Sequence, residues 1–175
     1  VKSTGVQTRA SKIQVKEIGR QEFIQKFLEI FKTMIKQFKS RYKRPIWADE
    51  THLATGFAFN DSTSFIMDPT LPDEEVMKYK PSAGDIDIII PENLKEDLWV
   101  YLDSLEGKDI IPGATYMGSN KPTVSSIGEQ INAVFVVDFA NGQRCHAQVD
   151  FEFLPFENGV PTDWAKFSHS SSFDD

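Results

Sequence analysis

Two aspartates near the middle of this 175-residue chain have the spacing of a metal site. Asp85 and Asp87 lie in the β-branched run 85–90, and alternate residues of a strand point to the same side, so their carboxylates project together. Carboxylates side by side repel each other and resist desolvation, so one should hold a proton at neutral pH unless a cation compensates. Mg²⁺ or Mn²⁺ removes this conflict, because both ions prefer oxygen ligands from carboxylates, water and phosphates.

The third candidate ligand is Asp150, within the predicted strand 144–154. Apolar residues flank Asp150 deep in that strand, where a carboxylate needs a partner. Its nearest rival is Glu152, one pleat further along. Asp138 is a weaker alternative because it lies close to a turn, where an acid is easily solvated. We therefore favour Asp150 as the partner of the acidic pair in a catalytic metal site.

The relative faces of these acids depend on the register of one hairpin. Asn141-Gly142, between the predicted strand 132–139 and the strand of Asp150, is typical of a tight two-residue turn. With this dipeptide at the centre of the turn, Asp150 faces Ala133 and Asp138 falls on the opposite face of the hairpin. A slip of one residue would reverse these faces.

The remaining pattern predicts an α+β protein. Apolar residues at steps of three and four predict an amphipathic helix that Pro45 ends, whereas most of the segment 60–81 predicts loop. We expect residues 1–18 to form a flexible arm and residues 19–175 a single domain, with Asp175 not its natural end. The predicted helices are 21–42, 73–79 and 92–105, and the predicted strands are 85–90, 110–117, 132–139 and 144–154.

Charge is unevenly distributed along the chain. Residues 1–44 hold 12 Lys and Arg against 3 Glu, whereas the rest holds 7 against 23 acidic residues. The basic arm is a candidate contact for a polyanion, and the alternative is a solvated helix face that neutralises an acidic body. The single cysteine, Cys145, excludes an internal disulfide, and no Cys/His spacing predicts zinc. With no run long enough to span a membrane, we expect a reducing, cytoplasmic setting.

The acidic residues and their flanks resemble the nucleotidyltransferase superfamily of the polymerase-beta type. Its pattern is a Gly-Ser or Gly-Gly turn, then an apolar-flanked Asp-x-Asp strand, then a third Asp on a later strand. The stretches 84–88 and 148–151 match the second and third parts. The stretch 80–87, with Trp164 and residues 168–171, is also similar to some phage-encoded members, which implies a host cytoplasm. In those members the chain continues into more helix.

The first part of the pattern matches imperfectly, because Phe57 stands where a small or hydroxyl residue should follow Gly56. The resemblance implies that this turn opens a helix whose N–H groups and hydroxyl hold a triphosphate. It assigns nucleotide binding to Gly56, Phe57, Ser62, Ser64 and Lys80, although 61–64 also fits a plain polar turn. Further candidate phosphate contacts, each equally consistent with an ordinary surface residue, are His52, Lys121, Arg144, His146, His169 and residues 168–172.

The resemblance implies a nucleotidyltransferase-like core, with a mixed or antiparallel sheet flanked by helices. It implies two-metal phosphoryl transfer with Mg²⁺ or Mn²⁺, in which Asp85 and Asp87 bridge the two ions and Asp150 completes the site of the ion that activates the attacking group. A nucleoside monophosphate passes from ATP or another NTP to the acceptor, and pyrophosphate is released. The acceptor stays open among RNA, protein and a small molecule, because one fold serves all of these. The alternative is a catalytically silent relative that binds a nucleotide or a partner.

Overall fold

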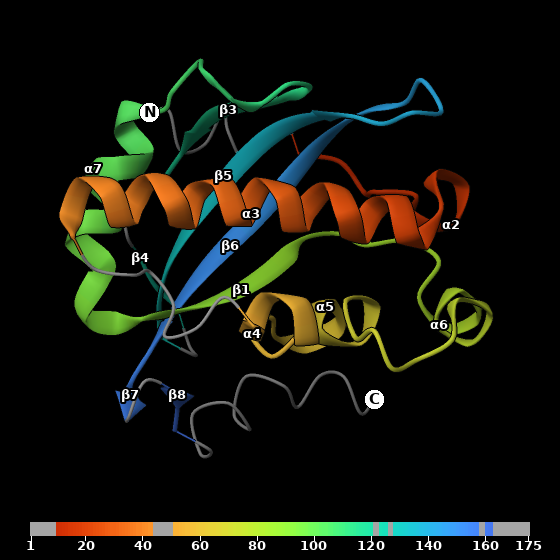
Figure 1. The fold of residues 1–175 in the computed structure, drawn as a ribbon, viewed down its shortest axis with the longest axis horizontal. Coiled ribbons are helices and arrows are strands. Elements are labelled where there is room, and N and C mark those ends of the chain that lie inside the picture. Colours follow the sequence, from red (N-terminus) through yellow and green to blue (C-terminus); the bar gives the residue numbers. More distant parts are fainter. Residues whose placement is uncertain (1–9, 44–50, 121–122, 126–127, 158–159, 163–175) are drawn as a thin grey trace.

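The computed structural model describes residues 10–43, 51–120, 123–125, 128–157 and 160–162. Its architecture is α+β: helices come first, and a mixed, curled sheet follows (Figure 1). No helix within these ranges is both long and apolar enough to cross a lipid bilayer. The predicted α+β class is therefore confirmed at the level of element order and sheet type.

The helices of the N-terminal half are α2 (Val15–Ile18), α3 (Arg20–Tyr42), α4 (Thr51–Thr55), α5 (Asp61–Ile66) and α6 (Asp73–Tyr79). The predictions of α3 and α6 are confirmed to within a residue. Helix α3 ends before the expected stop at Pro45, with Lys43 in the left-handed conformation (φ 61°). The prediction of loop is wrong for α5, because Pro69 and Pro72 lie beyond its end and break nothing inside it.

The strands and the helix between them are β1 (Ile86–Pro91), η1 (Glu92–Leu94), α7 (Lys95–Ser104), β2 (Asp109–Ile111), β3 (Ala114–Ser119), β4 (Thr123–Ser125), β5 (Gly128–Asp138) and β6 (Arg144–Leu154). The sheet order is β1-β6-β5-β3-β2, and β4 pairs with β5. Strand β1 is parallel to β6, and the other neighbours are antiparallel. Two further short strands, β7 (Phe156–Glu157) and β8 (Val160–Pro161), pair with each other.

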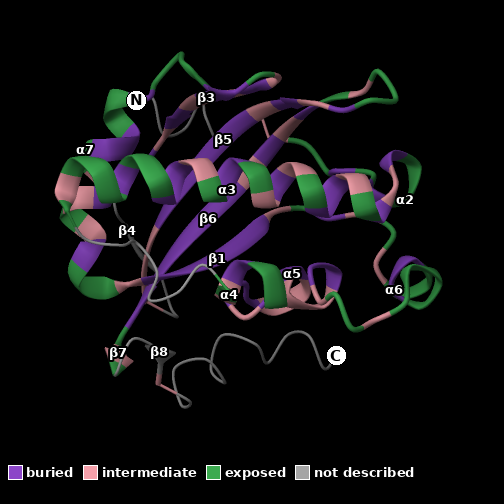
Figure 2. Ribbon diagram, in the orientation of Figure 1, coloured by how far each residue is buried: buried purple, intermediate pink, exposed green. Residues whose placement is uncertain are grey.

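Helix α3 lies across one face of the sheet and buries its apolar stripe there (Figures 1 and 2). The rings of Phe27 and Phe31 contact each other along the helix. The Phe27 ring centroid lies 6.5 Å from that of Phe139, and the Phe31 centroid lies 5.8 Å from that of Phe59. The even-numbered isoleucines of β1 join this cluster, whereas Ile89 packs separately on the other face. One face of β1 is therefore core, and the other carries the acidic residues.

The expected flexible arm of residues 1–18 is wrong for the part that the structure describes. Ile13 and Val15 are fully buried, and Ile13 exchanges two backbone hydrogen bonds with Ala83, at 2.7 and 2.9 Å. The few apolar residues of this segment show no clear periodicity, so the sequence does not predict that they pack against the rest of the domain. Residues 1–9 lie outside the described residues.

The hairpin between β5 and β6 has a three-residue loop rather than the predicted two-residue turn. The Gly142 N–H donates to the Phe139 carbonyl at 3.0 Å, and the Phe139 N–H donates to the Gln143 carbonyl at 2.9 Å. Within this loop only Gly142 has a positive φ (90°), which is the pattern of a type I turn followed by a glycine bulge. The bulge adds one residue to the turn and shifts the register by one.

Because of this shift, Asp150 faces Asn132 rather than Ala133. Asp138 then lies on the same face of the hairpin as Asp150, so the prediction of opposite faces is wrong. The two aspartates nevertheless stay well separated, because Asp138 pairs with Arg144 beside the turn. The new register places a buried amide, rather than a methyl group, next to Asp150.

Candidate metal centre

Three carboxylates converge where β1 and β6 run side by side. Asp87 is the direct neighbour of Asp150 across the parallel pair. Asp85, predicted to begin the strand, lies one residue before β1 in the structure. One oxygen from each of Asp85, Asp87 and Asp150 lies within 4.8 Å of the other two. Asp87 and Asp150 are only 6% and 5% exposed, and Asp85 is half-buried. The structure thus brings together the three aspartates that the sequence singled out.

Amide groups hold Asp150 from the side of the sheet away from β1. Its Oδ1 accepts hydrogen bonds from Asn132 Nδ2 at 2.7 Å and from Gln148 Nε2 at 2.9 Å. Asn132 in turn accepts at Oδ1 from Asn120 Nδ2 at 3.0 Å. This relay of donors across β5 and the end of β3 fixes the carboxylate by one oxygen, which suits a metal ligand whose orientation must be set.

The surroundings of Asp85 and Asp87 disfavour the ionised forms of both carboxyl groups. Burial raises the pKa of Asp87, and the neighbouring carboxylates of Glu152, Asp85 and Asp150 raise it further. Burial and a hydrogen bond with Asp150 raise the pKa of Asp85 to about 7. Both directions follow from placing like charges in a poorly solvated region. A divalent cation bound here would favour the ionised forms of Asp85 and Asp87.

A short extended segment, residues 58–60, borders β1 on its outer edge and carries the chain into α5. Phe59 bridges Ile88, and the Asn60 N–H donates to the Asp87 carbonyl at 3.0 Å. The buried Thr63 Oγ1 accepts from the Asp87 N–H at 3.0 Å, which ties α5 to the same residue. The backbone of Asp87 is therefore held from both of its polar groups.

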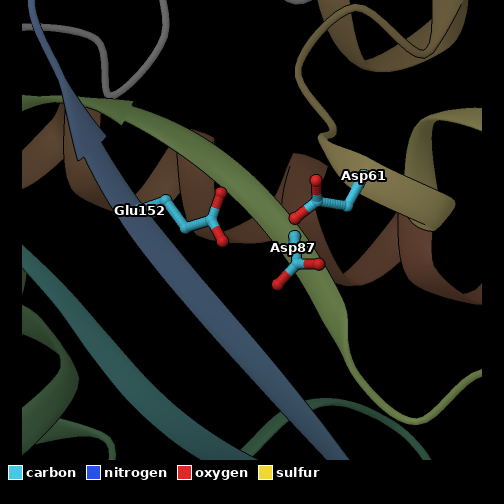
Figure 3. A group of neighbouring side chains, drawn as sticks. All are labelled: Asp61, Asp87 and Glu152. Carbon is cyan, nitrogen blue, oxygen red and sulfur yellow. The ribbon is translucent and has the colours of Figure 1, made fainter. Parts of the chain in front are cut away.

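The edge segment brings a second acidic group to the other side of Asp87. One oxygen from each of Asp61, Asp87 and Glu152 lies within 4.8 Å of the other two. Figure 3 shows Glu152 from β6 and Asp61 from the start of α5 turned toward Asp87. Glu152, the rival to Asp150 in the sequence, is thus close to the site without belonging to the same group of three acids.

The residues expected at the Gly-Ser turn take different places. Gly56 (φ 86°) lies close to the Met67 carbonyl, which a Cβ would approach to 3.1 Å, so packing accounts for this glycine. The half-buried Phe57 places its ring 5.0 Å from that of His52. Ser64 Oγ donates to the Asp61 carbonyl at 2.7 Å, within α5.

Two further candidates lie near the site in the chain. Ser62 is half-buried in the first turn of α5, directly after Asp61. Lys80 is half-buried at the end of α6, five residues before Asp85. Neither position by itself assigns the side chain to a nucleotide, so both stay predictions.

Other predicted phosphate contacts lie away from the acids or outside the described residues. Arg144 binds both carboxylate oxygens of Asp138, at 2.7 and 3.1 Å. It stands six residues before Asp150 on β6, a separation of roughly 20 Å at about 3.3 Å per residue. His146 lies between them on the same strand. The predicted phosphate contacts outside the described residues are Lys121, His169 and residues 168–172, and Trp164 of the phage-like resemblance also lies outside them.

Sequence reasoning missed the amides of the site. Asn132 and Asn120 are buried beside Asp150, and Asn60 is buried beside Glu152. The available signal was an asparagine at the start of an otherwise apolar strand, the prediction 132–139. Only the observed register turns that asparagine toward the acids.

Comparison of the chain with protein-family models, with curated proteins and with solved structures finds no significant match. No named fold is therefore assigned to the α+β architecture and its mixed, curled sheet. An argument for function has to rest on the side chains of the acidic site.

Proposed function

We propose that this chain is a metal-dependent nucleotidyltransferase. The observation that carries the proposal is the convergence of Asp85, Asp87 and Asp150, whose oxygens lie within 4.8 Å of one another. Asp87 and Asp150 are paired on β1 and β6, and Asp85 directly precedes β1. In the proposed reaction an acceptor hydroxyl attacks the α-phosphorus of an NTP. The bond to the β-phosphate breaks, pyrophosphate leaves, and a nucleoside monophosphate stays on the acceptor.

Asp85, Asp87 and Asp150 fit Mg²⁺ or Mn²⁺ because they are largely buried carboxylates with closely spaced oxygens, which are the ligands that these ions prefer. When bound, such ions lower the pKa of an acceptor hydroxyl and neutralise charge on the departing phosphates. Asp87 would provide a ligand from β1 and Asp85 from the residue before it, and Asp150 would complete the set from β6. Asn132 and Gln148 hold Asp150 in place for that role.

The finer assignment, a nucleotidyltransferase-like core, is part of the same proposal. It is supported by the acidic β1 lying parallel to the later strand that carries Asp150. It is also supported by a helix that opens beside Asp87, since α5 begins at Asp61 in the left-handed conformation (φ 50°) and continues with Ser62. In this proposal the turn at Asp61-Ser62, rather than Gly56-Phe57, takes the role of the Gly-Ser turn.

The test is release of pyrophosphate from each labelled NTP, ATP included, with Mg²⁺ or Mn²⁺ and with RNA, protein and small-molecule acceptors. We expect turnover that EDTA abolishes. Asp138→Asn is the matched control, because it removes a carboxylate from the same sheet face at its other end, and it should keep full activity. Absence of pyrophosphate with every NTP in both metals would contradict the proposal.

One observation favours the alternative, a catalytically silent module that binds a nucleotide or a partner. The ring of Phe57 packs beside His52, and this position offers no hydroxyl to a phosphate. A silent module predicts that an NTP with Mg²⁺ raises the melting temperature while no pyrophosphate forms. The transferase proposal predicts both signals together.

A polyanionic partner of the basic N-terminal segment stays a separate proposal. Lys32, Lys36 and Lys39 line a hollow on the exposed side of α3, together with Ser40. Arg20, by contrast, is buried and bonds the Ile66, Leu71 and Asp68 carbonyls, so part of the positive charge is structural. Replacing the three lysines by Gln should weaken RNA binding and flatten its salt dependence.

A further inference from the structure

Asp61, Asp87 and Glu152 form a second group of three acids, which shares only Asp87 with the three predicted aspartates. It joins two strands and the start of a helix, and its carboxylates point toward one another (Figure 3). Glu152 is only 3% exposed and Asp87 6%, so water solvates neither acid well. Three carboxylates with oxygens this close offer a hard divalent cation its preferred ligands.

Asp61 is held beside Asp87 by its backbone. The preceding residue, Asn60, donates its N–H to the Asp87 carbonyl at 3.0 Å. Asp61 itself adopts φ 50°, a left-handed conformation that an aspartate tolerates better than most residues. Glu152 is the next residue on the same face of β6 after Asp150 and lies opposite Ile89. Three separate elements thus direct these acids to one point.

An independent observation comes from the side chain of Asn60, which is only 1% exposed. Its Nδ2 donates to Glu152 Oε1 at 3.1 Å, which places the carboxamide against the acidic group. Its Oδ1 is buried and has no hydrogen-bond partner. Reversing the amide does not solve this, because two oxygens would then face each other across the same contact. A buried carbonyl oxygen beside three carboxylates is a ligand set for a hard cation.

We propose that Asp61, Asp87, Glu152 and the Asn60 Oδ1 hold a second divalent cation, Mg²⁺ or Mn²⁺, in the nucleotide-free protein. Asp87 is then shared between this cation and the one bound by Asp85 and Asp150. The use of both cations in phosphoryl transfer rests on the proposed function, but their binding does not. The chain itself, and not only a substrate phosphate, supplies the ligands of the second ion.

The experiment counts Mn²⁺ bound to the full, nucleotide-free chain, using the electron paramagnetic resonance signal of free Mn²⁺ during titration. We expect two Mn²⁺ per wild-type chain. Glu152→Gln keeps an acceptor for Asn60 but removes the charge, and it should weaken the second Mn²⁺ at least about tenfold. Glu157→Gln is the matched control, because it removes an exposed charge on β7 and should leave both ions bound.

A single Mn²⁺ in the wild type, or two ions with unchanged affinity in Glu152→Gln, would overturn the inference. Circular dichroism establishes whether each variant is folded. If Glu152→Gln does not fold, Asp61→Asn decides in its place, because Asn accepts the left-handed conformation and Asp61 is half-buried at a helix start. Retention of both ions in Asp61→Asn would count against the site in the same way.

The two proposals fail differently. Two bound Mn²⁺ without pyrophosphate release from any NTP would leave the second cation site standing and remove the transferase. Pyrophosphate release by a chain that binds one Mn²⁺, with Glu152→Gln as active as wild type, would leave the transferase standing and remove the second site. Neither result can be mistaken for the other.

Discussion

The two ends of the β5–β6 hairpin place carboxylates in opposite environments. Near the turn, Asp138 is partly exposed and paired with Arg144, and its hydrogen bonds with Arg144 lower the pKa of Asp138. At the other end, Asp150 and Glu152 are buried beside Asp87, and burial together with like charges raises the pKa of Asp87. Only the second end gathers several buried carboxylates within 4.8 Å of one another, and this is the end where we propose a metal ion.

The difference separates an acid that serves the fold from acids that work against it. A surface pair such as Asp138–Arg144 adds little to stability, because water already solvates both charges. Clustered buried acids lower stability until a proton or a cation relieves them. Variants at the two ends should therefore change different properties, and the following measurements compare them.

The largest effect is expected for Asp87→Asn, which removes the acid shared by both groups of carboxylates. Turnover should fall by more than about a hundredfold, since even changes to residues behind the ligands cost ten- to a hundredfold. Stability in EDTA should be unchanged or higher, because like-charge repulsion is relieved. Pyrophosphate release and thermal melting measure the two effects. Asp150→Asn should behave alike, and retained activity in either variant would remove that residue from the mechanism.

A smaller effect is expected for Asn132→Leu, which removes the amide that donates to Asp150 at 2.7 Å. Mn²⁺ affinity and turnover should fall by roughly ten- to a hundredfold, because Asp150 loses its orientation. Stability should fall by about 1–3 kcal/mol, since the buried Asn120 also loses its partner. Isothermal titration with Mn²⁺ and urea unfolding test this, with the exposed Asn93→Leu as control. Unchanged Mn²⁺ affinity would make Asn132 purely structural.

The pH dependence of stability should distinguish the acidic end by its sign. A raised pKa means that the folded state keeps protons that the unfolded state has already released, so stability falls as pH rises. For Asp85 this loss spans the interval from about 4 to about 7, and for Asp87 it extends further upward. Melting temperature in EDTA should therefore drop across this range, and Mg²⁺ should restore it most at high pH. A melting temperature that rises with pH in EDTA would contradict the shifts.

The smallest effect is expected for Asp138→Asn and Arg144→Gln at the turn. Both side chains are partly or largely exposed, and their pair lies on the same sheet face as the site but far along the strands. Turnover, Mn²⁺ binding and the Mg²⁺ effect on melting should all match the wild type. A loss of turnover in either variant would show that the two ends of the hairpin are coupled.

The sequence by itself was enough for the elements with strong local patterns. The amphipathic period of α3, the short helix α6 and the isoleucine-rich β1 all follow from the spacing of apolar residues. Strand alternation places Asp87 on the face opposite the even-numbered isoleucines, but it does not fix the side of Asp85, which lies one residue before β1. Helix α5 escaped prediction because it is short and polar, and the packing of Ile13 and Val15 escaped because their partners lie far along the chain.

Tertiary structure decided everything that joins distant residues. A single glycine bulge set the hairpin register and thereby placed Asn132, rather than Ala133, beside Asp150. The edge segment before α5 brought Asn60 and Asp61 to Asp87. Alternation along one strand is a local property of the backbone, so sequence determines it. Pairing and register between strands depend on the free energy of the whole packed sheet, and no local pattern carries that information.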